Sequence, residues 1–496
     1  MTGRRRRVSS RSRVLLSLLA VFLVASGGLV AAVVTYQHQR HGTPSSVAGG
    51  GDHRSPVASP APVVQTTAPA AWALTPSPAA VALSPPTRLP AGEKPTAKGL
   101  TAMLAPRLAD PAFAGGTVSI VVGDPLTGAV LLNDGGTTGV LPASTAKLAV
   151  AAAALEALGP RHRLTTKTAL AADGRVVLVG GGDPTLAGPK AVGRFDPGFP
   201  APARLADLAA QTASALKARG VTHVQLGYDD SLFTGPSLAP GWKPTYIAEG
   251  DVAPVSALEV DEGQPDLAKP ARTNNPSAVA ASDFAALLTA NGVKVDGAPE
   301  PARGGGATLA SVQSPTVAAL IERMLGRSDN DLAEALTRHV AIALDHPATF
   351  AGGAQGVREV ITKLGVEPDG FAMVDGSGLS RSDRVRPQAL VQLVDALLSP
   401  AHPQFSPVLQ GLPVAGFSGT LASRYASPPA LTASGLVRAK TGTLDGVVAL
   451  AGFTYDASGR VLSFAIVANG IANNATLKAE AALDGLSAGL AGCGCG

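Results

Sequence analysis

The chain has 496 residues, of which 46% are hydrophobic and 15% charged, enough for two or three domains with substantial cores. Its formal net charge of +4 comes from the N-terminus, because residues 1–13 hold six arginines and no acid, which leaves −2 for the remainder. A near-neutral body has no electrostatic footprint for nucleic acid, so nucleic-acid binding is excluded.

The N-terminal region predicts export and attachment to a membrane. Residues 14–36 are 23 consecutive uncharged residues, enough to cross a bilayer of about 30 Å as a helix. The preceding arginines make residues 1–13 a cytoplasmic basic tail and place the remaining chain on the extracytoplasmic side. Because the segment exceeds the apolar core of a cleaved signal, we expect a single-pass anchor in the cell membrane. A removed secretory signal is the alternative.

Residues 37–96 are expected to form a disordered, Pro/Ala-rich spacer. Within them, residues 41–95 contain 11 prolines in 55 residues and show no apolar periodicity, so they cannot bury a core. The two cysteines, Cys493 and Cys495, lie at the extreme C-terminus. This pair could bind a metal or oxidise, but a frayed tail is the favoured interpretation.

Folded structure is expected from residue 97 onward. Apolar periodicity and turn residues predict short strands at 117–124, 129–133, 175–179, 221–226, 447–455 and 461–469. The same criteria predict helices at 99–108, 149–158, 203–219, 283–290, 315–325, 331–344, 387–398 and 475–490. Strands at both ends with helices between them predict one sheet built from the two termini and covered by helices.

Ser144 and Lys147 form an S-x-x-K pair at the start of the alanine-rich helix. Positions three residues apart share a helix face, so the hydroxyl and the amine are expected to be neighbours. A lysine whose pKa is lowered by burial can take the proton of a hydroxyl and so activate a nucleophile. Alone, this pair is a weak signal in a chain of this length.

Two further polar motifs follow in the chain. Ser328-Asp329-Asn330 lies in the connection between two helices, where Asp329 is expected to cap the second helix rather than act as a catalytic acid. Lys440-Thr441-Gly442-Thr443 precedes a strand and combines a positive charge, two hydroxyl donors and a glycine that permits close approach, which suits a carboxylate ligand. Three motifs in this order form a strong signal.

This ordered set resembles the signature of penicillin-binding proteins and the related β-lactamases. The sequence around these motifs is similar to that of the D-alanyl-D-alanine carboxypeptidase/endopeptidase family of class C low-molecular-mass penicillin-binding proteins, from about residue 97 to 490. The segments that carry this similarity are Leu141–Leu148, Gly181–Leu186, Asp230–Phe233 followed by Gly241–Trp242, Pro254–Leu258, Ser328–Asn330 with Ala333–Glu334, Asp375–Arg381, Gly419–Leu421 and Lys440–Thr443. Ser328 lies 184 residues after Ser144, far more than a compact class A β-lactamase needs, and the interval resembles the inserted domain of the class C family.

The resemblance implies an α/β (α+β) fold. A β-lactamase/transpeptidase-like domain, an antiparallel sheet flanked by helices, would comprise residues 97–165 and about 280–496. A smaller inserted α+β domain would occupy about 166–279. The implied activity is that of a serine-type D-Ala-D-Ala carboxypeptidase or endopeptidase, a hydrolase acting on peptidoglycan stem peptides and acylated by β-lactam antibiotics.

The same resemblance assigns roles to residues. Ser144 is expected to attack the peptide carbonyl with Lys147 as its base. Ser328, helped by Lys440, would relay a proton to the leaving amine. Asn330 would hold the substrate amide.

The third motif is expected to bind substrate through Lys440, Thr441, Gly442 and Thr443, with the backbone N–H groups of Ser144 and Thr443 as the oxyanion hole. No metal or organic cofactor is expected, since the eight histidines show no ligand spacing.

Other interpretations remain open at this point. A catalytically idle, membrane-anchored peptidoglycan-binding protein is one alternative, and an esterase or peptidase of the same fold is another. Ser377, in Asp375-Gly-Ser-Gly, could suggest a second nucleophile, but it lacks the strand–turn–helix context, so a structural turn lining the cleft is favoured. Trp242 and Phe233 are expected to serve packing.

Overall fold

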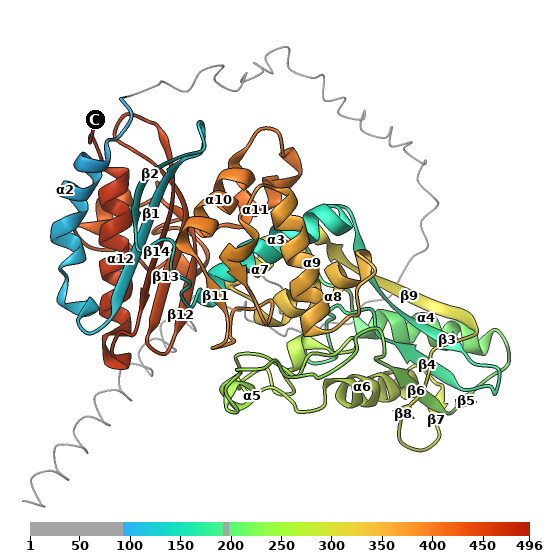
Figure 1. Cartoon of the computed structure of the whole chain (residues 1–496). Coiled ribbons are helices and arrows are strands. Elements are labelled where there is room, and N and C mark those ends of the chain that lie inside the picture. The colour runs from blue at the N-terminus through green and yellow to red at the C-terminus, as the bar shows by residue number, and fades with distance from the viewer. Residues whose placement is uncertain (1–92, 192–197) are drawn as a thin grey trace, which may run out of the picture. The chain divides into compact units, whose positions relative to one another are not determined.

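The structure is a computed structural model that describes residues 93–191 and 198–496 (Figure 1). The predicted basic tail, the predicted membrane segment at 14–36 and nearly all of the predicted spacer lie outside the described residues. Among the residues that are described, no helix is both long enough and apolar enough to cross a membrane.

The first sheet has five antiparallel strands in the order β12-β13-β14-β1-β2. Their bounds are β1 Thr117–Asp124, β2 Ala129–Asp134, β12 Arg438–Leu444, β13 Val447–Tyr455 and β14 Val461–Asn469. β1 pairs with β14 from Thr117 opposite Asn469, so the two ends of the folded chain meet inside one sheet. The predicted fold class, with one sheet built from both termini, is confirmed.

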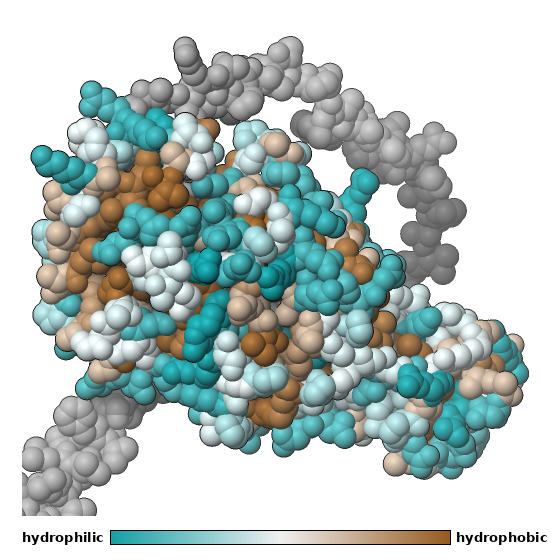
Figure 2. All heavy atoms as spheres, viewed as in Figure 1, coloured by the Kyte–Doolittle hydropathy of each residue, from teal (hydrophilic) through white to brown (hydrophobic). Residues whose placement is uncertain are grey.

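Both faces of this sheet are covered by helices (Figure 1). Ile120 and Val122 of β1 pack in one hydrophobic core with α2 (Ala97–Leu108) and α12 (Thr476–Ala491), whereas Val121 packs in a second core on the other face. Alternate strand residues point to opposite faces, so a sheet buried on both sides needs continuous apolar strands. On the face shown in Figure 2, hydrophobic residues gather around the first sheet and α12, which is rich in alanine and leucine.

The second core is made by a helical layer around α3. The layer consists of α3 Lys147–Leu158, α7 Val317–Arg327, α8 Asn330–Ala343, α9 Phe350–Lys363, α10 Pro387–Leu398 and α11 Ser406–Gly411. In α3, every residue from 147 to 155 is buried, and its alanines let α8 and α9 pack closely around it. The sequence did not predict α9, because glycines break its apolar pattern. One of them, Gly353, lies where a Cβ would be 2.5 Å from the Thr337 side chain on α8.

A second five-stranded sheet, β8-β6-β4-β3-β9, lies within the interval between Ser144 and Ser328. Its strands are β3 Arg163–Leu170, β4 Val176–Val179, β6 Leu226–Asp229, β8 Glu300–Pro301 and β9 Ala307–Thr316. It packs with α4 (Leu205–Lys217) and α6 (Pro276–Ala290) around a separate hydrophobic core. Because β9 pairs with β3, the strands of this sheet range from 163 to 316, beyond the interval of 166–279 expected for the inserted domain.

The remaining described α-helix and strands are short. They are α5 Tyr246–Glu249 and the paired strands β5 His223–Val224 with β7 Lys294–Val295 and β10 Phe371–Ala372 with β11 Arg384–Val385. The strand predicted at 221–226 is thus divided between β5 and β6. Helix α6 starts seven residues earlier than predicted, because Asn275 caps it and Pro276 occupies its first position.

The C-terminal tail is ordered, so the prediction of a frayed tail was wrong. Cys493 is 2% exposed and belongs to the core shared by α2 and α12. The Cys495 carbonyl accepts a hydrogen bond of 2.9 Å from the Thr96 backbone N–H, which ties the tail to the start of α2. The two cysteines form a disulfide with each other.

Candidate active site

Ser144 lies in a single 3₁₀ turn, Ala143–Ala146, that leads directly into α3. The backbone just before it is confined on two sides. A Cβ on Gly442 of β12 would lie 2.9 Å from the Pro142 carbonyl oxygen, and a Cβ on Gly378 would lie 2.1 Å from that of Ala143. Ala143 itself has φ of 48°, a conformation that costs energy outside glycine. The surrounding chain therefore holds the serine in one position.

Lys147 is completely buried one turn after the serine. Its Nζ lies 2.9 Å from Ser144 Oγ, 2.6 Å from Asn330 Oδ1 and 2.6 Å from the Ser377 carbonyl oxygen. Burial lowers the pKa of the amine to about 8, against the opposing influence of nearby carboxylates. A neutral amine has two N–H donors and one lone pair. In the neutral form, the two pure acceptors take the two N–H donors, which leaves the lone pair for the serine proton.

The second motif lies where α7 ends and α8 begins. Ser328 closes α7 in the left-handed conformation, with φ of 59°. Asp329 caps α8 by accepting a 2.9 Å hydrogen bond from the Leu332 N–H, which confirms the predicted cap. Asn330 is the first residue of α8. Its Oδ1 accepts from Lys147, while its Nδ2 donates to the Asp251 carbonyl at 2.7 Å.

The third motif lies on β12, antiparallel to β13. Lys440 is fully buried, and its Nζ lies 2.9 Å from both Ser328 Oγ and the Thr441 carbonyl oxygen. Burial, together with the charge of Lys147, lowers the pKa of Lys440 well below its usual value. Each motif lysine thus contacts a motif serine, and the two lysines influence each other electrostatically.

The eight residues predicted for the site lie close together, and five of them line one cavity. Ser144, Ser328, Asn330, Thr441 and Thr443 line an open cleft of about 470 Å³. The two lysines lie behind this lining, in the contacts described above. The glycine of the third motif was expected to let a substrate backbone lie close, but the room for its side chain is taken by the residues that precede the nucleophile.

Charged and hydroxyl side chains make up much of the remaining lining. Lys243 and Asp445 form an ion pair at the cleft, and Glu249 and Asp251 also face it. The Thr443 hydroxyl donates to Glu480 Oε1 at 2.6 Å. A carboxylate of the chain itself is therefore bound to a hydroxyl that was assigned to the substrate carboxylate.

The sequence reasoning missed the loop that supplies the third contact of Lys147. The turn predicted at 375–381 is confirmed, and the Ser377 hydroxyl is buried and bonded to Asp375 rather than free to attack. The backbone N–H groups of Ser377 and Gly376 donate to Glu334 Oε1, at 2.8 Å and 3.1 Å. Burial and the neighbouring Asp375 raise the pKa of Glu334 to about 7. A backbone carbonyl carries no residue-type signal that could have found this contact.

The aromatic side chains near the cleft serve packing, as predicted. The Trp242 ring packs edge-on against Phe350, with ring centroids 5.7 Å apart, and its Nε1 donates to Asp375 Oδ2 at 2.6 Å. Phe233 is buried against His339 in the same manner. The tryptophan therefore also helps to fix the loop behind Lys147.

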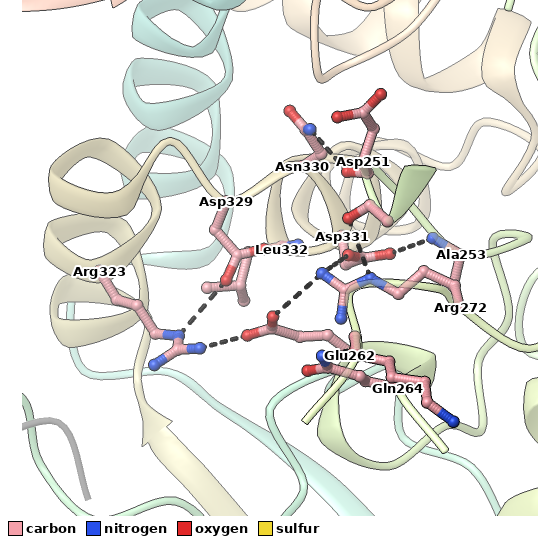
Figure 3. A network of polar contacts seen from close by, with 12 residues as sticks. Asp251, Ala253, Glu262, Gln264, Arg272, Arg323, Asp329, Asn330, Asp331 and Leu332 are labelled. Atoms are coloured by element: carbon pink, nitrogen blue, oxygen red, sulfur yellow. Dashed lines mark hydrogen bonds and ion pairs between the residues drawn. The ribbon is translucent and has the colours of Figure 1, made fainter. Parts of the chain in front are cut away.

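One group of carboxylates has spacing suited to a cation. Oxygens of Glu262, Asp329 and Asp331 lie within 4.8 Å of one another. Arg323 pairs with the first two, and Arg272 pairs with Glu262 and Asp331 (Figure 3). These guanidinium groups supply the positive charge at this position, so the group reads as an ion-pair network.

Comparison with known proteins places the chain in a family. Residues 100–271 and 266–490 match the D-Ala-D-Ala carboxypeptidase 3 (S13) family. The chain is 39% identical to carboxypeptidase DacB of Mycolicibacterium smegmatis over 408 residues, covering 81% of this chain and 86% of that protein. It is 31% identical to the D-alanyl-D-alanine carboxypeptidase of an Actinomadura species, covering 76% and 82%.

Among solved structures, penicillin-binding protein 4 of Haemophilus influenzae matches with a TM-score of 0.62 and 22% identity, covering 75% of this chain and 93% of that one. This likeness shows the same fold. The sequence matches show more, and the chain belongs to the D-Ala-D-Ala carboxypeptidase 3 (S13) family.

Proposed function

We propose that this member of the S13 family is a serine-type D-Ala-D-Ala carboxypeptidase that hydrolyses peptidoglycan stem peptides through an acyl-enzyme on Ser144. The observation that carries the proposal is the buried Lys147 amine, 2.9 Å from the Ser144 hydroxyl, with its other two contacts made by pure acceptors. A buried amine with a pKa near 8 is a suitable general base at physiological pH.

In this mechanism Lys147 takes the Ser144 proton as Oγ attacks the carbonyl of the terminal D-Ala-D-Ala bond. The backbone N–H groups of Ser144 and Thr443 stabilise the oxyanion, a contribution of about 3–4 kcal/mol per donor in measured cases. Ser328 and Lys440, 2.9 Å apart, form a second hydroxyl–amine pair that can pass a proton to the leaving D-alanine amine. Water then hydrolyses the ester and releases the shortened peptide.

Substrate recognition would use the polar lining of the cleft. The hydroxyls of Thr441 and Thr443 would donate to the terminal carboxylate. The Thr441 hydroxyl now contacts that of Thr420, and the substrate carboxylate would have to displace Glu480 from Thr443. Asn330 would contact the substrate amide through Oδ1 or Nδ2, each of which can make one hydrogen bond more than it makes now. β-Lactam antibiotics would acylate the same serine and leave slowly.

Intact mass after incubation with a penicillin tests the nucleophile. We expect one covalent adduct on the wild type and none on Ser144→Ala, with both proteins showing the same thermal melting. An unmodified wild type under native conditions would refute the acyl-enzyme. Release of D-alanine from a stem pentapeptide, lost in Lys147→Ala, then tests the carboxypeptidase activity. Cleavage of cross-linked dimers without D-alanine release would identify an endopeptidase instead.

We also propose that the enzyme is held at the extracytoplasmic face of the cell membrane by residues 14–36. The support is the 23-residue uncharged segment preceded by six arginines. Intact mass of the mature protein purified from the membrane fraction tests this proposal. A chain that retains residues 1–36 is expected, whereas a product that begins after residue 36 would show that the segment is a cleaved signal.

A further inference from the structure

Asn330 can help the base in only one of its two amide orientations. With Oδ1 towards Lys147, the amide accepts a hydrogen bond from Nζ. After a flip, the amide NH₂ would face the amine, where it would either oppose the N–H donors or occupy the lone pair that the serine proton needs. We propose that Arg272 and Asp331 are positioning residues that lock Asn330 in the productive orientation by holding the Asp251 carbonyl in place.

The Asp251 carbonyl decides the orientation because it can only accept. It lies 2.7 Å from Asn330 Nδ2, on the side of the amide away from Lys147. If the amide were flipped, two carbonyl oxygens would face each other there, while the Lys147 side would lose its acceptor. The orientation therefore depends on a backbone group from the inserted segment, 79 residues before Asn330.

Arg272 and Asp331 grip the backbone on both sides of Asp251 (Figure 3). Arg272 Nε donates to the Gly250 carbonyl at 3.2 Å. Asp331 Oδ1 accepts from the Ala253 N–H at 2.8 Å. We call Arg272 and Asp331 the clamp, because they also pair with each other, with Nη2 and Oδ2 3.6 Å apart.

The clamp is buried and tied to the catalytic helix. The side chains of Arg272 and Asp331 are 12% and 3% exposed, so water competes weakly for their contacts. Asp331 directly follows Asn330 at the start of α8, so one helical turn carries both the positioned amide and half of the clamp. The backbone N–H of Arg272 also donates to the Ile247 carbonyl at 2.9 Å, which fixes the other half.

This inference rests on the proposed function, so its test needs one readout that works without catalysis. Acylation rate by a penicillin is the first readout. The second is an NMR titration of the Lys147 side chain in isotope-labelled protein across pH, which reports the pKa of the buried amine whether or not Ser144 reacts. The titratable groups around that amine are Asp329, Asp331, Glu334, Asp375 and Lys440.

The decisive comparison is a double-mutant cycle between the clamp and Asn330. Arg272→Gln is expected to slow acylation about tenfold, the cost of losing one hydrogen bond to a charged group. In an Asn330→Ala background the same substitution should change neither the acylation rate nor the Lys147 titration. Direct electrostatic or general structural effects of Arg272 would persist there, and their persistence in both readouts would overturn the inference.

Two matched variants complete the test. Asp331→Asn keeps an acceptor for the Ala253 N–H and should retain most of the activity, whereas Asp331→Leu should lose as much as Arg272→Gln. Arg323→Gln removes the network's other guanidinium, which pairs with Glu262 and Asp329, and should change acylation less than twofold. Equal losses in Arg323→Gln and Arg272→Gln would refute the clamp. A wild type that fails to acylate would refute the proposed function, while the Lys147 titration would still decide the clamp.

Discussion

Acylation of Ser144 should rise with pH through about 8, because attack requires the neutral form of Lys147. Its pKa is lowered to about 8 by burial. Below this value most of the amine is protonated and has no lone pair for the serine proton. The neutral fraction is about 1% at pH 6, about 9% at pH 7 and about 91% at pH 9. The second-order acylation constant should therefore increase about ninefold to tenfold for each pH unit below 7 and reach a plateau above pH 9.

The measurement is the rate of adduct formation by intact mass under second-order conditions, from pH 6 to pH 10. Control incubations of the penicillin alone correct for hydroxide-catalysed opening of the lactam ring. Thermal melting at each pH shows that the protein remains folded. A rate that is flat or falling between pH 6 and pH 9 would refute Lys147 as a base with a pKa near 8, because the neutral fraction of such an amine rises steeply over this range.

Three further predictions concern the groups around the site. Glu334→Gln removes a buried carboxylate that favours the ammonium form of Lys147, so the rising limb of the acylation profile should move to lower pH. A move to higher pH would contradict the role of Glu334 in raising the pKa of Lys147. Gly442→Ala should abolish acylation and lower the melting temperature, because the added Cβ would lie 2.9 Å from the Pro142 carbonyl oxygen. Wild-type activity in this variant would show that β12 can shift to make room for it. Glu480→Gln should lower KM for a carboxylate substrate severalfold, measured by D-alanine release, because it removes a negative charge at Thr443; an unchanged KM would place the carboxylate elsewhere.

The sequence was sufficient for the three central strands of the first sheet, β1, β13 and β14, because they are buried on both faces. Such strands read as continuous apolar runs, as in 447–455 and 461–469, whose bounds match β13 and β14. The edge strand β12 holds the polar site residues 440–443, and the amphipathic strands β3 and β9 carry polar residues at their exposed positions. None of these three segments was predicted as a strand. Helix α9 was also missed, because its glycines lower its helix propensity while allowing close contact with α8.

In the site, the sequence revealed the functional side chains but not the backbone groups that contact them. Ser144, Ser328 and Lys440 were found because each motif requires particular side chains. The acceptors that orient the base on its far side are the Ser377 carbonyl and, through Asn330, the Asp251 carbonyl. Any residue type carries a carbonyl, so only the folded chain reveals which ones face the amine.

The two buried lysines imply that substrate binding itself activates the nucleophile. The charge of Lys147 is one of the causes that lower the pKa of Lys440, and this repulsion is mutual. A ligand carboxylate bound at Thr441 and Thr443 would favour a proton on Lys440. The charge of protonated Lys440 would in turn lower the pKa of Lys147. Binding of an anionic substrate should therefore shift the pair towards neutral Lys147, the form that accepts the Ser144 proton.

The pH profile of acylation separates this coupling from a fixed base. The second-order constant reports the pKa of the free enzyme, whereas the rate at saturating ligand reports that of the complex. For a penicillin with a free carboxylate, the rising limb at saturation should lie at lower pH than the limb of the second-order constant. For its methyl ester the two limbs should coincide, because no ligand charge draws a proton to Lys440. Coincident limbs for both ligands would mean that the two lysines titrate independently, and that burial alone sets the base.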